Sequence, residues 1–303
     1  MKATNHRRRI RDARNYFAVL CVMRFFCILP RKTGIAIARF LARVYYALNT
    51  KHRKNTINHL SMALGKEKTP IEIRKIARNV FLHFATVAVD TMRIPDYIKA
   101  GMERYISVKD LSVVEEARAK GKGIIFLTGH FGNWELMGAY MAALGYPLVV
   151  VSRASSNPAM DRLISDMRNN AGYYNIPRGK STREILKALK KGYALGILID
   201  QDTKVRGVFV DFFGQKAHTP VGPILLAKRF DIPIIPIFMY LLPDLTYTIE
   251  CLDPVELVDT GDVDADLIAN VQKCSDAYER IIRRYPDQWA WFHRRWKTRP
   301  TTS

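Results

Sequence analysis

Alternation of short apolar strands with helical segments, from about residue 104 onward, constrains the fold more than any other feature of the sequence. The predicted strands have apolar side chains on both faces and lie at 104–108, 123–128, 147–152, 193–199, 232–240 and 246–252. Strands of this kind occur in sheets that are covered by helices on both sides. The segments between the strands supply helical patterns for that cover. We therefore expect an α/β fold with a mostly parallel central sheet flanked by helices.

Polar side chains follow three of these strands directly. His130, Arg153 and Asp200 each come just after a predicted strand, and a loop is expected from Asp200 to Thr219. Ligands of parallel sheets bind beyond the carboxyl ends of the strands. We expect these three side chains to face one site.

The stretch FLTGHFGNWEL, residues 126–136, joins the end of a strand to the start of a helix. Asn133 is a good N-cap, Gly132 permits a tight bend, and Glu135 in the first helical turn suits the helix dipole. If His130 stays in the loop, the Glu135 carboxylate can orient its imidazole and make it a general base. Backbone N–H groups at 132–133 could also receive an oxyanion. The alternative is a structural histidine and a glutamate that only complements the helix dipole.

The net charge points to an anionic partner. Lys and Arg number 48 against 28 Asp and Glu, which gives a formal charge of +20. Such an excess suits nucleic acid, an anionic membrane face or an acidic protein or substrate. No zinc-finger spacing, RNP-type motif or heptad-backed basic region occurs in the sequence, so no nucleic-acid partner is expected.

The N-terminal region, residues 1–50, has the composition of a membrane-associating segment. A basic stretch precedes an apolar run from Tyr16 to Leu29, which Arg24 interrupts and which is too short for a full span. The next segment places Arg39 and Arg43 one turn apart among apolar residues. We expect two helices that lie in a membrane face, followed by an α/β domain over 51–303. A helical hairpin packed on the protein's own core, or a single span, are the alternatives.

Several stretches resemble one known group of enzymes. HFGNWE (130–135) matches the His-x4-acidic motif of the membrane-associated acyltransferases. The wider pattern is similar to that of the bacterial lipid A late acyltransferases, the lauroyl and myristoyl transferases. The further matching stretches are GILIDQD (196–202), VDFFGQKAHTPVGPILLAKR (210–229), IPIIPIF (232–238) and YPDQWAWFHRRWKTRP (285–300). In order and spacing the match covers about residues 15 to 300.

This resemblance implies transfer of a fatty acyl chain from a thioester to a hydroxyl of a lipid A precursor. The donor would be carried by acyl carrier protein or coenzyme A, and the acceptor would be an anionic glycolipid at the cytoplasmic face of the inner membrane. His130 would deprotonate the acceptor hydroxyl while Glu135 holds the imidazole, without an acyl-enzyme, a metal or a bound organic cofactor. Alternatives are the same chemistry on a phosphatidylinositol mannoside, an aminolipid or a lysophospholipid, or a non-enzymatic basic peripheral membrane protein.

Other residues are candidates for substrate binding. Asn133 lies in the motif, and Arg153 and Arg168 suit anionic groups because a guanidinium fork matches phosphate geometry. Asp200 and Asp202 could bind sugar hydroxyls or a basic partner residue, or could only cap the loop. In WAWFHRRW, three tryptophans (Trp289, Trp291 and Trp296) are expected to pack and to anchor at an interface. Arg294 and Arg295 are expected to face lipid headgroups.

Overall fold

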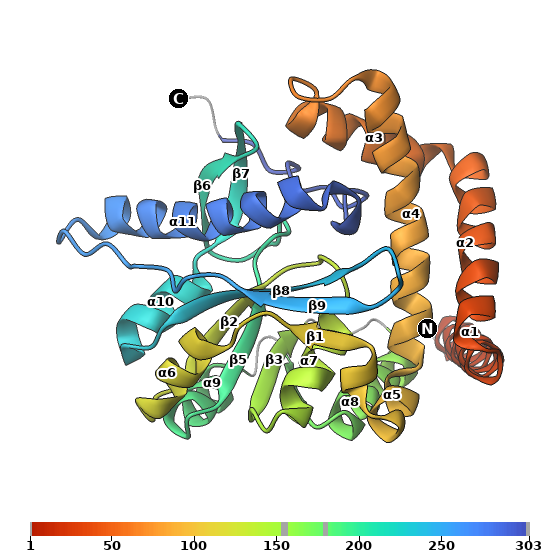
Figure 1. The fold of residues 1–303 in the computed structure, drawn as a ribbon, viewed down its shortest axis with the longest axis horizontal. Coiled ribbons are helices and arrows are strands. Elements are labelled where there is room, and N and C mark those ends of the chain that lie inside the picture. Colours follow the sequence, from red (N-terminus) through yellow and green to blue (C-terminus); the bar gives the residue numbers. More distant parts are fainter. Residues whose placement is uncertain (1, 153–156, 178–180, 301–303) are drawn as a thin grey trace.

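The computed structural model describes residues 2–152, 157–177 and 181–300 and confirms the predicted α/β class (Figure 1). Its main sheet has seven strands in the order β1-β9-β8-β2-β5-β3-β4. These strands are β1 (Ile106–Val108), β9 (Tyr247–Cys251), β8 (Ile234–Leu241), β2 (Ile124–Thr128), β5 (Ala194–Leu198), β3 (Leu148–Ser152) and β4 (Tyr174–Pro177). Five of the six pairings are parallel, and β8 pairs with β9 in the antiparallel sense.

Helices cover both faces of the sheet because the side chains of its central strands alternate between two apolar clusters. On β2, Ile125 and Leu127 belong to one cluster, while Ile124 and Phe126 belong to the other. The first cluster includes α3 (Thr50–Leu64), α4 (Pro70–Met92), α9 (Ser181–Lys190), α10 (Gly222–Phe230) and α11 (Val263–Arg284). The second includes α5 (Ile94–Ala100), α6 (Ser112–Ala119) and α7 (Trp134–Ala143). Helix α8 (Pro158–Asn170) contributes no buried residue to either cluster.

Two structural features were missed by the sequence reading. The expected loop from Asp200 to Thr219 is wrong for most of its length, since β6 (Gly207–Phe212) and β7 (Gln215–Pro220) form an antiparallel hairpin. Phe213 and Gly214 make its turn with φ of 53° and 68°, as a two-residue hairpin requires. The short strand β4 was also missed, because only one of its residues is buried and it has no apolar run.

The N-terminal segment forms two helices, α1 (Lys2–Ile28) and α2 (Arg31–Leu48), with the break at Pro30. Figure 1 shows α2 running alongside α4 at one edge of the molecule, and the two helices are in contact along their lengths. Both N-terminal helices leave large apolar side chains exposed: Phe17, Val22, Phe25, Ile28, Phe40, Leu41, Val44, Tyr45 and Leu48. None of the helices in the described part of the chain has the length and apolar character needed to span a bilayer.

A buried ionic cluster joins α2 to the body of the protein. The Arg31 guanidinium donates from Nε and Nη2 to the two carboxylate oxygens of Asp90 on α4, at 2.9 and 2.8 Å. The hydroxyls of Tyr97 and Tyr247 donate to the same carboxylate. The Asp90 side chain is fully buried, so its charge depends on Arg31 for compensation.

The C-terminal aromatic stretch packs inside the protein. Trp289, Trp291 and Trp296 are all buried, which confirms their packing role and leaves none of them at an interface. Arg295 is buried as well and donates to the carbonyl of His218 and the hydroxyl of Thr219 at 2.5 Å each. The expectation that Arg295 faces headgroups is therefore wrong, whereas Arg294 is exposed.

Candidate active site

His130 lies in the short connection between β2 and α7, and two glycines shape that connection. A Cβ on Gly129 would lie 2.9 Å from the Tyr278 ring and 3.1 Å from the Asp200 carboxyl carbon. Gly132 has φ of +57°, and a Cβ there would lie 1.6 Å from the carbonyl oxygen of Met239. These positions accept only glycine, so the loop is held close against Asp200 and β8.

Asp200, rather than Glu135, is the carboxylate that orients His130. Its Oδ1 lies 2.9 Å from His130 Nδ1, and its Oδ2 accepts from the His130 backbone N–H at 2.7 Å. Trp289 Nε1 donates to the same Oδ2 at 2.9 Å. An ionised carboxylate only accepts hydrogen bonds, so the ring proton belongs on Nδ1 and the lone pair on Nε2. This is the tautomer that a general base needs.

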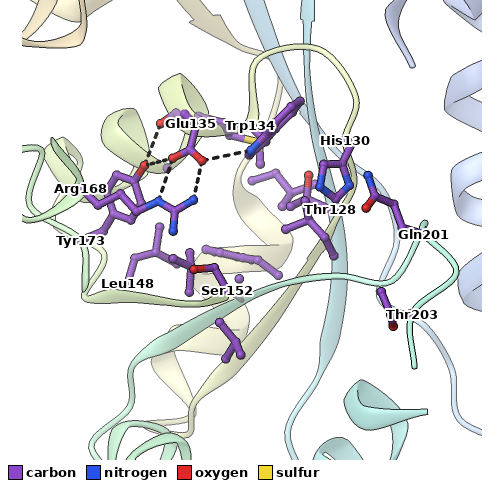
Figure 2. Close-up of a pocket in the computed structure, with 18 of the residues that line it drawn as sticks. Thr128, His130, Trp134, Glu135, Leu148, Ser152, Arg168, Tyr173, Gln201 and Thr203 are labelled. Carbon is purple, nitrogen blue, oxygen red and sulfur yellow. Dashed lines mark hydrogen bonds and ion pairs between the residues drawn. The ribbon is translucent and has the colours of Figure 1, made fainter. Parts of the chain in front are cut away.

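Glu135 belongs to a second polar cluster, and the expected hydrogen bond to His130 is replaced by others. Arg168 donates to it from Nε at 3.0 Å and from Nη2 at 2.5 Å. The Tyr173 hydroxyl donates at 2.6 Å and Trp134 Nε1 at 3.2 Å. Figure 2 shows Trp134 between His130 and this cluster. Glu135 occupies the first turn of α7, as predicted, but from there its side chain points toward Arg168 and Tyr173 (Figure 2).

Both carboxylates are ionised because their partners outweigh their burial. Burial would raise the pKa of Asp200, but the charge and hydrogen bonds of His130, with Trp289, hold that pKa below its ordinary value. Burial would likewise raise the pKa of Glu135, and Arg168, Tyr173 and Trp134 lower it. For His130, burial alone would lower the pKa; the charge and hydrogen bond of Asp200, and then the charge of Glu135, raise it above its ordinary value.

A cavity of about 800 Å³ opens beside the histidine ring (Figure 2). One wall is the α7 face of the sheet, where Phe126, Leu148, Gly196 and Ile237 come from four adjacent strands. The facing wall is α7 itself, with Met137, Gly138 and Met141. The His130 side chain is 29% exposed and lines this cavity. The arrangement places the His130 ring in the wall of a cavity whose sheet and α7 sides are largely apolar.

The remaining predicted site residues have varied positions. Asn133 is fully buried and caps α7, accepting from the Leu136 N–H and the Thr91 hydroxyl at 3.1 Å each, so it cannot reach a substrate. Arg153 lies outside the described residues. Arg168 lines the cavity, but Glu135 neutralises it. Asp202 lines the cavity too, and its Oδ2 accepts from the Thr298 N–H at 2.6 Å.

Two further expectations change. The Gly132 N–H donates to the carbonyl of Gln288 at 2.9 Å, so it is unavailable for an oxyanion. Asp200 binds the histidine and is buried, so it does not meet sugar hydroxyls. Within the described residues, no three His, Cys, Asp or Glu side chains converge as a metal site requires.

Sequence reasoning missed Trp289 as a partner of Asp200 and Tyr173 as a partner of Glu135. Trp289 lies 89 positions from Asp200, and no local pattern signals a pairing over that separation. Tyr173 follows α8 in the segment that leads to β4, the strand that was also missed. Asp200 was found by its position after a strand, which indicated a site residue but not its role.

Comparison with known proteins gives a consistent assignment. Residues 1–298 match the model of the bacterial lipid A biosynthesis acyltransferase family. The lipid A biosynthesis lauroyltransferase of Escherichia coli K12 is 29% identical over 84% of this chain and 82% of its own length. The palmitoleoyltransferase of lipid A biosynthesis from the same organism is 26% identical over 90% of this chain and 85% of its own length. The phosphatidylinositol mannoside acyltransferase of Mycolicibacterium smegmatis is 22% identical over 85% and 84%.

The fold, the histidine beside the cavity and these relatives define an acyltransferase that acts on a lipid acceptor. The non-enzymatic alternative is thereby set aside. The chain belongs to the bacterial lipid A biosynthesis acyltransferase family, as the resemblance of its motifs indicated.

Proposed function

We propose that the enzyme transfers a fatty acyl chain from an acyl thioester, with acyl carrier protein as the expected carrier, to a hydroxyl of a lipid A precursor. The observation that carries this proposal is the His130 ring, bonded to Asp200 through Nδ1 and lining a cavity of about 800 Å³ with two largely apolar sides. A cavity of this size, with apolar side chains of the sheet on one side and of α7 on the other, fits a fatty acyl chain.

In the proposed reaction, Nε2 of His130 takes the proton of the acceptor hydroxyl while the hydroxyl oxygen attacks the thioester carbonyl carbon. Asp200 stabilises the imidazolium that forms. The tetrahedral intermediate collapses with cleavage of the carbon–sulfur bond, and the imidazolium returns its proton to the leaving thiolate. The products are an ester on the acceptor and a free thiol, and the enzyme is unchanged. No acyl-enzyme is needed.

Glu135 acts in this proposal at longer range. Its charge contributes to the raised pKa of His130, and its bonds to Arg168 and Tyr173 hold one wall of the cavity in place. The second catalytic residue of the sequence motif thereby supports the base electrostatically, while direct orientation comes from Asp200.

Replacement of the base tests the chemistry. The His130→Ala variant should fold, bind lipid vesicles as the wild type does, and lose transfer of a labelled acyl chain from acyl carrier protein. Retained transfer would refute the base assignment. Substituting acyl coenzyme A for acyl carrier protein in the purified assay identifies the donor.

The acceptor has a second candidate, because the relatives include phosphatidylinositol mannoside acyltransferases. Mass spectrometry of the host's lipids with and without the gene distinguishes the two. Loss of an acyl chain from lipid A supports the first acceptor, and an unchanged lipid A excludes it.

We further propose that α1 and α2 attach the enzyme to the inner membrane at its cytoplasmic face. Their exposed apolar side chains, including Phe25, Ile28 and Leu48, offer a surface for the interfacial region of a bilayer. Replacing these three with Ser should reduce binding to anionic vesicles while transfer in detergent persists. Vesicle binding that survives the change contradicts this attachment.

A further inference from the structure

Two lysines at the histidine end of the cavity have charges that no acid of the described chain pairs with. Lys204 and Lys297 line the cavity with His130. Arg168, the remaining Lys or Arg of the cavity wall, is neutralised by Glu135. Several surface lysines do have carboxylate partners: Lys109, Lys122, Lys216 and Lys228. Lys204 and Lys297 are exposed as well, and what distinguishes them is their place in the cavity wall, where they add positive charge.

The two lysines come from distant segments that are fixed to each other. Lys204 follows β5, and Lys297 lies near the C-terminus. Asp202 joins the segments by accepting from the Thr298 N–H at 2.6 Å. The Asp202 side chain is 5% exposed, and its Oδ1 lies 3.5 Å from His218 Nδ1. This carboxylate offsets one of the two lysine charges, so a net positive charge remains at this wall.

A neutral donor accompanies the lysines. Thr203 lines the cavity, and its Oγ1 is shielded from solvent and has no hydrogen-bond partner. Figure 2 shows Gln201 and Thr203 on the His130 side of the cavity, at the opposite end from Glu135 and Arg168. A buried hydroxyl without a partner needs explanation, and a ligand oxygen in the cavity would supply the missing bond.

We propose that Lys204, Lys297 and Thr203 form a phosphate subsite beside His130. Two ammonium groups and a hydroxyl suit a phosphate ester, which has up to two negative charges and several acceptor oxygens. The ester belongs either to the headgroup of the lipid acceptor or to the pantetheine arm of the donor. This inference rests on the proposed acyl transfer and assigns the group that holds one substrate in register with the base.

The test is a grid of substrates against a double variant, Lys204→Gln/Lys297→Gln. The acceptor is a phosphorylated glycolipid or the same lipid after phosphatase treatment. The donor is an acyl phosphopantetheine or an acyl N-acetylcysteamine, which lacks phosphate. The variant should lose about tenfold or more in kcat/KM with the substrate whose phosphate is bound. With the corresponding phosphate-free substrate it should match the wild type.

Controls separate this effect from global charge. Lys190→Gln/Lys191→Gln removes the same charge from exposed positions outside the cavity wall and should leave kcat/KM unchanged. Lys204→Arg/Lys297→Arg should retain most of the wild-type value, because the charges remain. A thermal unfolding scan confirms that each variant folds.

Each outcome bears on the proposal. A loss confined to phosphorylated acceptors identifies the headgroup, and a loss confined to phosphopantetheine donors identifies the arm. An equal loss with all four substrate pairs, or no loss with any, overturns the subsite. A wild-type enzyme that transfers no acyl chain with any pair contradicts the proposed function instead.

Discussion

The carboxylates of Asp200 and Glu135 lie near the cavity and bind different side chains. Asp200 is buried and bonded to His130 through a ring nitrogen and a backbone N–H, at 2.9 and 2.7 Å. Glu135 is bonded to Arg168 and Tyr173, which form part of the cavity wall. Asp200 therefore holds the proposed proton acceptor, whereas Glu135 holds a guanidinium that cannot take part in proton transfer at physiological pH. Proximity to a histidine in sequence is a poor guide to which acid serves it.

Of the replacements that distinguish the two acids, that of Asp200 should reduce kcat/KM the most. Asp200→Asn removes the charge that stabilises the imidazolium and allows the wrong ring tautomer. We expect kcat/KM to fall about 10³-fold to 10⁴-fold, the scale known for orienting aspartates. Steady-state transfer of a labelled acyl chain measures it. A loss smaller than that of Glu135→Gln would reverse the roles assigned to the two acids.

Replacement of Glu135 should act first on stability. Glu135→Gln leaves the Arg168 charge largely buried and without its partner, which costs about 3 kcal/mol of unfolding free energy. Denaturant titration measures this loss. The double variant Glu135→Gln/Arg168→Met should recover much of it, because removal of both charges is often close to neutral. A double variant that remains as unstable as the single one would show that Glu135 has another structural partner.

The two acids should also differ, to a smaller extent, in how their replacement shifts the pH dependence of kcat/KM. Only neutral His130 can accept a proton, so kcat/KM falls as the pH drops through the raised pKa of His130, above about 6.5. Asp200→Asn removes the larger favourable charge and should move this limb to lower pH. Glu135→Gln should move it in the same direction by less. Glu116→Gln, an exposed change on α6, is the control.

The smallest effect is expected at Trp134, which contacts both clusters. Trp134→Phe removes the Nε1–H bond to Glu135 at 3.2 Å and keeps an aromatic ring next to His130. We expect a loss of about 1 kcal/mol in transition-state stabilisation, which is about fivefold in kcat/KM. A loss comparable to that of Asp200→Asn would mean that the indole takes part in the reaction.

Much of the fold could be predicted because it depends on local patterns. The apolar strands and the helices between them are visible in short windows, and so are Asn133 as a cap and the two helices of the N-terminal region. The β6–β7 hairpin escaped because its strands mix polar and apolar residues and because QKAHTP has no strand-like run. Its stability comes from packing on α11, which local sequence does not reveal.

In the candidate site, too, the features that depend on local sequence could be predicted and those that depend on tertiary contacts could not. The position of His130 followed from the strand–helix junction, and Asp200 was expected at the same edge of the sheet. Which acid meets the ring depended on side-chain directions across 70 positions, and those are fixed by tertiary contacts with Trp289 and Arg168. Sequence separation of five residues favoured Glu135, and three-dimensional packing favoured Asp200.

The ion pair between Arg31 and Asp90 makes the N-terminal helices inseparable from the rest of the enzyme. A variant that begins after α2 would lack Arg31. The buried Asp90 carboxylate would then keep only the hydrogen bonds from the two tyrosine hydroxyls. Thr91, the neighbour of Asp90, bonds to Asn133 at the start of α7, so damage there lies one contact from the loop of His130. Removal of α1 and α2 would therefore destabilise the structure that positions the catalytic loop.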